Sequence, residues 1–392
     1  MNKLVYSVYI IMPLILLWHS KFYGKGKFND EFLSLEQTKA LQGFLALCIM
    51  LHHIGQKTCA SWLTPKTRII HGLDLFEPMG FMYVAVFLFF NGYGVYKSFH
   101  SKDNYLKGFI KRRILPVVLA LYTTTIIFFI ARLILGEKMD GKLVFFYLTS
   151  IKLCNPNTWY VIVLPFFYLA FYLAFKFIKK DGLAVAAVTT FVLLYMFGSC
   201  YLLHNDFWIR GEWWYNCVHL FPIGIIFAKF ESKIIAHVKK FYYIYLAVFV
   251  LGVYPAYRFS KFVLMFHGYY MEFLPDYPYH KMIGLSSEML VTFVFTMAVL
   301  LVGMKLKIGN KFLAFMGTIT LEFYLIHGIF VEMFDHQFCS VIKSPFPIKN
   351  VFLYVVLVFI LGIPSAVLLK KLHTLILGLG KRTEDSKNKK IA

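Results

Sequence analysis

The chain has 392 residues, of which 59% are hydrophobic and 19% aromatic, and it carries a formal net charge of +21 at pH 7. This apolar share exceeds that of a soluble domain, so the composition excludes a purely aqueous protein and indicates one that crosses a lipid bilayer several times. The basic residues fall in short clusters between apolar runs rather than over one face. This pattern argues against nucleic acid as a partner and relates the charge to membrane topology.

Eleven apolar runs are long enough to cross a hydrocarbon core about 30 Å thick. They lie at 4–18, 40–56, 79–97, 114–135, 158–178, 182–202, 213–230, 241–258, 287–304, 312–333 and 351–372. The first run is short, and the seventh and tenth contain polar residues, so we expect an all-α bundle of ten or eleven transmembrane helices. Residues 1–378 then form one transmembrane domain, in which the first run could also lie peripherally.

The distribution of Lys and Arg predicts how the chain is oriented in the membrane. If the first run enters from outside, the loops that hold most of the basic residues, including 19–39 and 98–113, all fall on one side. The positive-inside rule then places the N-terminus outside and the C-terminus in the cytoplasm of a cell membrane. Residues 379–392 are charged and are expected to form a disordered cytoplasmic tail.

The six cysteines show neither a CxxC motif nor a spacing to histidine that is typical of a metal site. They are Cys48, Cys59, Cys154, Cys200, Cys217 and Cys339. We therefore expect no metal ion and no required disulfide.

The second run begins near Gln42 and ends with the histidine pair His52 and His53, without a charge between them. His53 lies eleven positions after Gln42, close to three helical turns, so both side chains project from one face about 16 Å apart. An ionisable ring at that depth predicts a functional site, because it is costly unless it lines a cavity or meets a partner. A histidine satisfied by a neighbouring helix is the alternative explanation.

The tenth run carries Thr320, Tyr324 and His327 at i, i+4 and i+7, which places them on one polar face of a helix. Glu322 points elsewhere, about 140° from His327 around the helix. The polar stripe predicts either a site or a set of hydrogen bonds that hold neighbouring helices together.

The third run ends in Asn91, Gly92, Tyr93 and Gly94, where the glycines permit close helix packing or a ligand beside the backbone. In the loop that follows, residues 111–113 (Lys111, Arg112 and Arg113) could hold phosphate groups by charge-assisted hydrogen bonds. The alternative is an ordinary topological cluster that faces anionic lipid.

Aromatic residues open two of the runs on the predicted outer side. Asn157, Thr158, Trp159 and Tyr160 precede or begin the fifth run, and Glu212, Trp213, Trp214 and Tyr215 the seventh. Interfacial aromatic belts account for most such residues, and an aromatic platform for an acceptor sugar is the other interpretation.

Taken in order, four of these segments resemble the markers of the membrane acyltransferase 3 family. The first marker is a basic residue followed by ten intervening residues and then a histidine. Here the histidine is His53 and Gln42 occupies the basic position. Lys39, nearly one turn earlier, is the stand-in for the basic residue. The second is a phenylalanine-rich run into Ser-Gly-Tyr before a basic loop, with Asn91 here in the serine's place.

The third and fourth markers lie later in the chain. A Trp-Tyr pair that opens a mid-chain helix is similar to Trp159 and Tyr160. A Ser-x-x-x-Tyr-Leu-x-His run is similar to Tyr324, Leu325 and His327, with Thr320 in the serine's place. The resemblance covers most of the chain, from residue 32 to residue 327.

The resemblance implies an integral membrane O-acyltransferase that moves an acyl group, usually acetyl from acetyl-CoA, to a hydroxyl of an extracytoplasmic glycan or small acceptor. The implied catalytic residues are His53, His327 and Tyr324. The implied donor-binding residues are Lys111, Arg112, Arg113, Gln42 and Lys39. The implied acceptor-binding residues are His52, Asn91, Tyr93, Trp159 and Glu322.

Two alternatives stay open at this point. His53 could act as a general base or carry the acyl group covalently. A non-enzymatic transporter or export partner for a lipid-linked sugar would also explain several spans with polar helix faces.

Overall fold

The computed structural model describes residues 3–63, 72–209, 211–335 and 344–391, with side chains up to residue 378. Most of these residues are helical and very few are in strands, which confirms the predicted all-α class. The α-helices in chain order are α1 (Val8–Leu17), α2 (Leu35–Thr58), α3 (Gly80–Ser101), α4 (Leu115–Ile134), α5 (Gly141–Leu148), α6 (Trp159–Phe177), α7 (Asp181–Ser199), α8 (Leu220–Lys240), α9 (Tyr242–Phe266), α10 (Tyr277–Gly303), α11 (Lys311–Thr318), α12 (Thr320–Phe334) and α13 (Val351–Ile391). Two short antiparallel strands, β1 (Lys21–Phe22) and β2 (Leu306–Lys307), pair Lys21 with Lys307.

Among the described residues, seven helices are long and apolar enough to cross a membrane. They are α3, α4, α6, α7, α9, α10 and α13. An eighth span would be the pair α11 and α12, which is bent by 83°. The protein is therefore a multi-pass membrane protein with fewer such helices than the ten or eleven expected.

All eleven expected runs contain helix. The number of candidate spans is lower because some of these helices are too short or too polar to qualify. The helical segment at the start, Lys3–Leu17, is too short to qualify as a span. Helices α2 and α8 extend into charged sequence, and α8 begins only at Leu220 because Glu212–Trp214 forms a separate 3₁₀ turn, η4. A short additional helix, α5, lies in a segment that was expected to be a loop.

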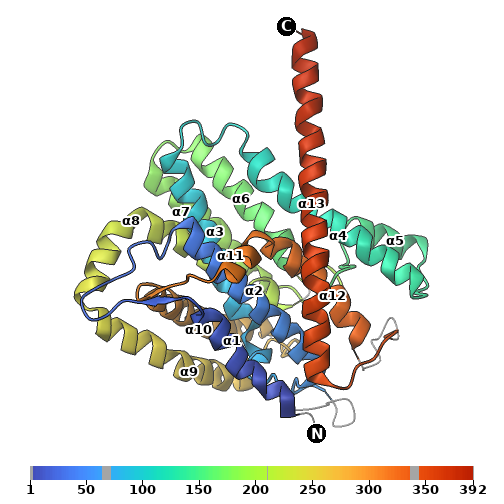
Figure 1. Cartoon of the computed structure of the whole chain (residues 1–392), viewed down its shortest axis with the longest axis horizontal. Coiled ribbons are helices and arrows are strands. Elements are labelled where there is room, and N and C mark those ends of the chain that lie inside the picture. The colour runs from blue at the N-terminus through green and yellow to red at the C-terminus, as the bar shows by residue number, and fades with distance from the viewer. Residues whose placement is uncertain (1–2, 64–71, 210, 336–343, 392) are drawn as a thin grey trace.

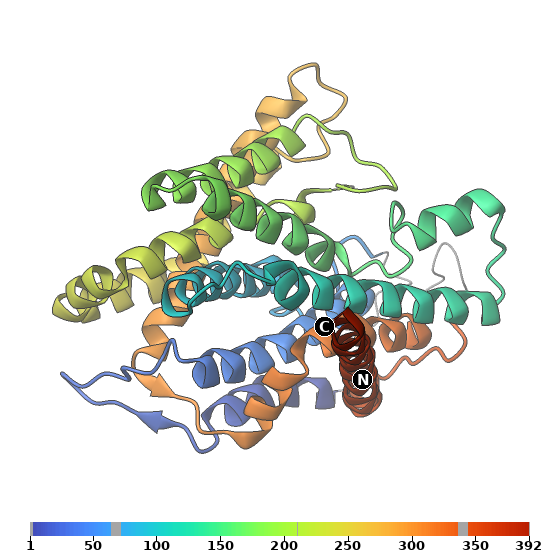
Figure 2. The same cartoon turned by 90° about the horizontal axis from the view of Figure 1, so that it is seen from above.

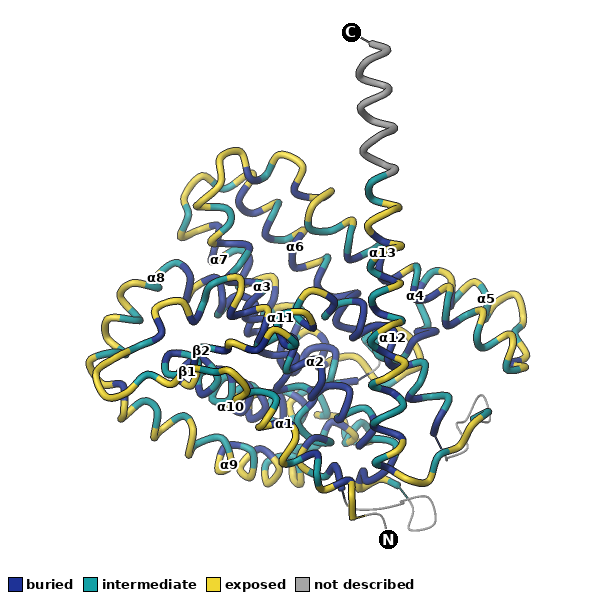
Figure 3. Tube along the Cα trace, viewed as in Figure 1, coloured by how far each residue is buried: buried dark blue, intermediate teal, exposed yellow. Residues whose placement is uncertain are grey.

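Helix α2 lies at the centre of the molecule and most of its residues are buried (Figure 3). It begins where the Ser34 hydroxyl accepts a hydrogen bond from the Gln37 backbone N–H, at 3.3 Å, which satisfies an otherwise free donor of the first turn. The Gln37 side chain then exchanges two hydrogen bonds with the Ile308 backbone, at 2.9 and 2.8 Å. These contacts fix the start of α2 against β2.

Two glycines allow the backbones of α2 and α11 to pack in direct contact. A Cβ atom on Gly43 would lie 2.5 Å from the Leu313 carbonyl oxygen and 2.7 Å from the Gly317 nitrogen. A Cβ on Gly317 would collide with the Lys39 carbonyl. Because α12 follows α11 directly, this packing sets how α12 lies beside α2.

Helices α3 and α8 pack in the same way. A Cβ on Gly92 would collide with the Phe221 carbonyl, and one on Gly224 with the Phe89 carbonyl. The predicted close helix approach is thus confirmed at Gly92, whereas a Cβ on Gly94 would meet nothing within 4 Å.

The outer helices surround this centre loosely. Helix α9 packs mainly against α10 and is largely exposed. Helices α8 and α9 meet at one edge of the molecule (Figure 1), and in the view from above α13 is seen nearly end-on (Figure 2). Helix α13 projects beyond the body towards the C-terminus (Figure 1). It extends through the residues expected to form a tail, of which only the backbone is described, so the separate tail stays a prediction.

Candidate functional site

The two histidines singled out from the sequence meet in the structure. His53 of α2 and His327 of α12 lie with Nδ1 of the first 2.8 Å from Nε2 of the second. Their rings are nearly parallel, at 12°, with centroids 5.0 Å apart. His327 is fully buried, whereas His53 keeps part of its surface accessible.

The hydrogen bonds around this pair determine where its protons lie. Nδ1 of His327 is 2.7 Å from the Phe323 carbonyl oxygen, and a carbonyl can only accept, so this nitrogen carries a proton. In a neutral His327, Nε2 is then the acceptor, and His53 donates to it from Nδ1. The remaining nitrogen of His53, Nε2, is left with a free lone pair that can take a proton.

A cavity of about 340 Å³ leads towards the pair from the end of the bundle that carries Arg112 and Arg113, here called the basic end. Its lining residues on α2 are Lys39, Gln42 and Ile49, and those on α12 are Thr320, Leu321, Glu322 and Tyr324. His53 follows Ile49 by four residues and His327 follows Tyr324 by three. The cavity therefore stops about one helical turn, roughly 5 Å, before the histidines.

Tyr324 stands between the cavity and the histidine pair. Its ring centroid is 6.5 Å from that of His53 and 6.4 Å from that of His327. On its other side it meets the Tyr160 ring edge-on, at 5.8 Å. Tyr324 is thus a lining residue of the cavity whose ring also lies close to both histidine rings.

The cavity is electropositive. Four cationic side chains line it, and the one carboxylate in the lining is Glu322. The cations are Lys39, Arg112, Arg113 and Lys370. Glu322 lies 3.2 Å from Nδ1 of the buried His373, whose Nε2 is 2.7 Å from the Thr123 hydroxyl. This arrangement suits an anionic ligand.

The two arginines are held in place at the mouth. Arg112 donates to the Tyr105 carbonyl at 2.7 Å, and Arg113 donates to the Tyr105 hydroxyl at 2.8 Å and to the Ser98 hydroxyl at 3.2 Å. Both arginines also line a hollow of about 680 Å³ at the surface, together with Lys102 and Lys107. The arginine pair thus separates an outer basic hollow from the inner cavity.

A chain of hydrogen bonds runs along one wall of the cavity. The Tyr168 hydroxyl donates to the Asn91 side-chain oxygen, and the Asn91 amide donates to the Tyr160 hydroxyl, each at 2.6 Å. Since Tyr160 accepts here, its own proton is available to a ligand in the cavity. Tyr324 lines the same cavity, and in the described part of the chain no hydrogen bond involves its hydroxyl.

Four other sequence candidates lie away from the cavity. Lys111 does not line it. The His52 Nδ1 atom forms a hydrogen bond with the Glu77 backbone carbonyl, and the His52 ring packs on Gly80. Tyr93 stacks on Phe89 towards α8, and Trp159 is buried edge-on against Tyr160. Their proposed roles in donor or acceptor binding stay predictions.

Several residues that line or support the cavity were not among those singled out from the sequence. Tyr168 follows Tyr160 by eight residues, so helical spacing alone could have placed both on one face. Lys370 and His373 belong to α13, and no local pattern connects that helix to the site. Within the residues that the structure describes, no group of three or more His, Cys, Asp and Glu side chains could hold a metal ion.

A comparison with family models shows the family to which the chain belongs. Residues 36–371 match the model described as an acyltransferase domain, of the acyltransferase 3 type. No curated protein and no solved structure matches the chain. Because the match covers nearly the whole chain, including both histidines and the arginine pair, the chain belongs to the acyltransferase 3 family and is a membrane acyltransferase.

Proposed function

We propose that the protein transfers an acetyl group from acetyl-CoA, bound from the cytoplasm at the basic end, to a hydroxyl of an extracytoplasmic glycan or small acceptor. The observation that carries the proposal is the cavity that connects the arginine pair with Tyr324, one turn from the His53–His327 pair. An anionic donor with a long neutral arm matches a basic mouth that continues into a narrower interior. The basic end then faces the cytoplasm of the cell membrane, as the positive-inside rule also favours.

The donor would be held chiefly through its phosphates. Arg112 and Arg113 can each donate further hydrogen bonds to phosphate oxygens, and Lys102 and Lys107 add charge in the outer hollow. The pantetheine arm would then extend inward past Gln42 and Asn91, so that the thioester lies beside Tyr160 and Tyr324. Glu322 is the cavity's acceptor for the N–H groups of that arm.

The reaction needs a single proton transfer in each direction. His53 Nε2 takes the proton of the acceptor hydroxyl as its oxygen attacks the thioester carbonyl carbon. The new C–O bond forms, the C–S bond breaks, and the proton returns from His53 to the departing thiolate to give an ester and coenzyme A. His327 accepts from His53 Nδ1 throughout and so stabilises the imidazolium, as the orienting partner of a catalytic base does.

The tyrosines supply the other requirement of acyl transfer. The carbonyl oxygen becomes negatively charged during the attack, and hydrogen-bond donors that are already aimed at it stabilise that charge. The free hydroxyl protons of Tyr160 and Tyr324 are suitable donors on the same cavity wall.

The proposal is tested by measuring acetyl-CoA binding to the purified protein. An Arg112→Ala/Arg113→Ala variant should bind the donor at least about tenfold more weakly, because each lost charge-assisted bond is worth roughly 1.5–3 kcal/mol. Lys179→Ala, an exposed lysine at the same end, is the matched control and should bind normally. The absence of acetyl-CoA binding in the unaltered protein would overturn the proposal and leave transport of a lipid-linked sugar as the better explanation.

A further inference from the structure

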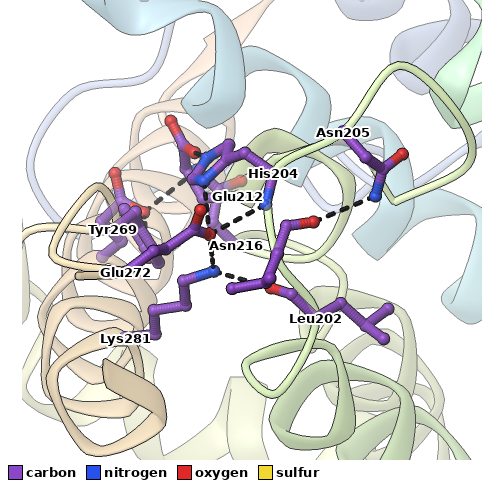
Figure 4. Close-up of polar contacts among 10 residues, drawn as sticks. Leu202, His204, Asn205, Glu212, Asn216, Tyr269, Glu272 and Lys281 are labelled. Carbon is purple, nitrogen blue, oxygen red and sulfur yellow. Dashed lines mark hydrogen bonds and ion pairs between the residues drawn. The ribbon is translucent and has the colours of Figure 1, made fainter. Parts of the chain in front are cut away.

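A group of charged side chains lies at the end of the bundle opposite the arginines, and Figure 4 shows its polar contacts. His204 lies 2.7 Å from Glu272 through Nδ1 and 3.2 Å from Glu212 through Nε2. Lys281 of α10 pairs with Glu272 and donates to the Leu202 carbonyl at 2.7 Å. These four charged residues, here called the clasp, tie the segment after α7, the η4 turn and the loop between α9 and α10 to one another.

Beneath the clasp, α10 carries a polar stripe that faces the segment 214–219. Lys281 and Glu288 are seven residues apart, so they share one face of the helix. Glu288 is buried and receives hydrogen bonds from the Asn216 amide at 3.1 Å and the Tyr269 hydroxyl at 2.7 Å. One turn further along, Thr292 lies 3.5 Å from Nε2 of His219.

Several polar atoms between this segment and α10 have no partner among the described residues. Asn216 Oδ1 and His219 Nδ1 are both buried and unpaired. Both hydrogen bonds described for Glu288 go to Oε2, and the Trp214 indole nitrogen of the same segment is also buried without a partner among the described residues. Buried polar groups in native proteins nearly always have a partner, so this set indicates that a hydrogen-bonding partner is missing here.

The unpaired atoms flank a residue that is electrostatically linked to the tyrosines of the donor cavity. Cys217, between Asn216 and His219 in the chain, is within electrostatic range of the Tyr160 and Tyr324 hydroxyls and of Glu288. The site therefore lies within electrostatic range of the tyrosines that line the donor cavity. An acceptor bound here would approach the histidine pair from the side opposite the donor.

The chemistry of these atoms restricts the class of ligand. The buried carboxylate of Glu288 disfavours an anion. The described residues around it offer no grouping for a metal ion. A neutral ligand with several hydroxyl groups matches best, because each hydroxyl can donate to a carboxylate or amide oxygen and also accept.

We infer that Asn216, His219 and Glu288 form the acceptor subsite, which binds a neutral, hydroxyl-rich glycosyl unit, and that the clasp is the cover that opens to admit it. This inference rests on the proposed function and deepens it. The donor enters among arginines at one end, and the acceptor enters beneath the clasp at the other.

The experiment uses the full-length purified protein, radiolabelled acetyl-CoA and, as the probe, oligosaccharides released from the surface glycan of the host cell. Glu288→Gln should raise the acceptor KM by about tenfold to a hundredfold and Asn216→Leu by about tenfold, with acetyl-CoA binding unchanged. Ser287→Ala is the matched control. It removes the 3.0 Å contact with Ser260 of α9 next to Glu288 but on another face of α10, and it should leave the acceptor KM unaltered.

The outcomes separate this inference from the proposed function. Normal donor binding with an unchanged acceptor KM in both Glu288→Gln and Asn216→Leu would overturn the acceptor subsite alone. A raised acceptor KM in Ser287→Ala as well would show a general packing effect and would also overturn it. Failure of the unaltered protein to bind acetyl-CoA would instead contradict the proposed function.

Discussion

The proton arrangement of the histidine pair leads to a quantitative prediction about His327. If His327 only accepts from His53, its role depends on presenting a lone pair at Nε2, 2.8 Å from His53 Nδ1. His327→Leu removes that acceptor while filling a similar volume, whereas His327→Gln offers a side-chain carbonyl oxygen in its place. The two variants should therefore differ in activity.

The size of each effect follows from the bond that is lost. In the transition state His53 is charged, and a hydrogen bond to a charged group is worth about 1.5–3 kcal/mol, so His327→Leu should lower kcat by about 10- to 150-fold. His327→Gln should lose less than about tenfold. His53→Gln removes the base itself and should cost about 10²- to 10⁴-fold.

The assay is transfer of radiolabelled acetyl from acetyl-CoA to host surface oligosaccharides by purified variants of equal abundance and folding. Donor binding is measured in parallel, because the arginine mouth is intact in all three variants. Activity of His327→Leu equal to that of the unaltered protein would refute the orienting role of His327. A covalent acetyl group trapped on His53 would show that the ring acts as nucleophile instead of base.

Three further predictions concern other parts of the molecule. Tyr324→Phe should lower kcat by about 10- to 10³-fold by removing a donor to the developing oxyanion, whereas Tyr122→Phe, at an exposed tyrosine of α4, should have no effect in the same transfer assay. Gly92→Ala should destabilise the protein by about 1–3 kcal/mol in detergent unfolding, because its Cβ collides with α8, and Gly94→Ala, two residues away with open space, should be close to neutral. Hydrogen bonds to Glu212 and Glu272 raise the pKa of His204 above its ordinary 6.5, although burial lowers it. The charged His204 therefore stabilises the fold fully below pH 6.5. This contribution to the free energy of unfolding is lost as the pH rises through the raised pKa. His204→Gln should therefore flatten the fall in thermal stability between about pH 6 and pH 8 that the unaltered protein shows.

The parts of the site that follow from local periodicity could be predicted from the sequence. The spacing of Gln42 and His53 on one helix, and of Thr320, Tyr324 and His327 on another, placed each set on a single face. The structure then joins the two faces through backbone packing at Gly43 and Gly317. That contact joins positions distant in the sequence, so no local pattern could predict that the histidines meet at hydrogen-bond distance.

Other features depend on tertiary contacts that hydropathy does not record. An apolar run has the same composition whether its helix is continuous and long enough to cross a membrane, as α10 is, or is broken, as α11 and α12 are at Ile319. The contribution of Lys370 and His373 to the cavity comes from α13, far along the chain. The buried partners of Glu288 come from two loops with no helical period.

The most direct test of the account uses the protein reconstituted in sealed liposomes, with acetyl-CoA supplied only at the basic end and host oligosaccharides enclosed only at the opposite end. The account predicts that the enclosed oligosaccharides become acetylated, and that His53→Gln abolishes this transfer without weakening donor binding. Acetylation only when donor and acceptor share one side of the membrane, or undiminished transfer by His53→Gln, would contradict it.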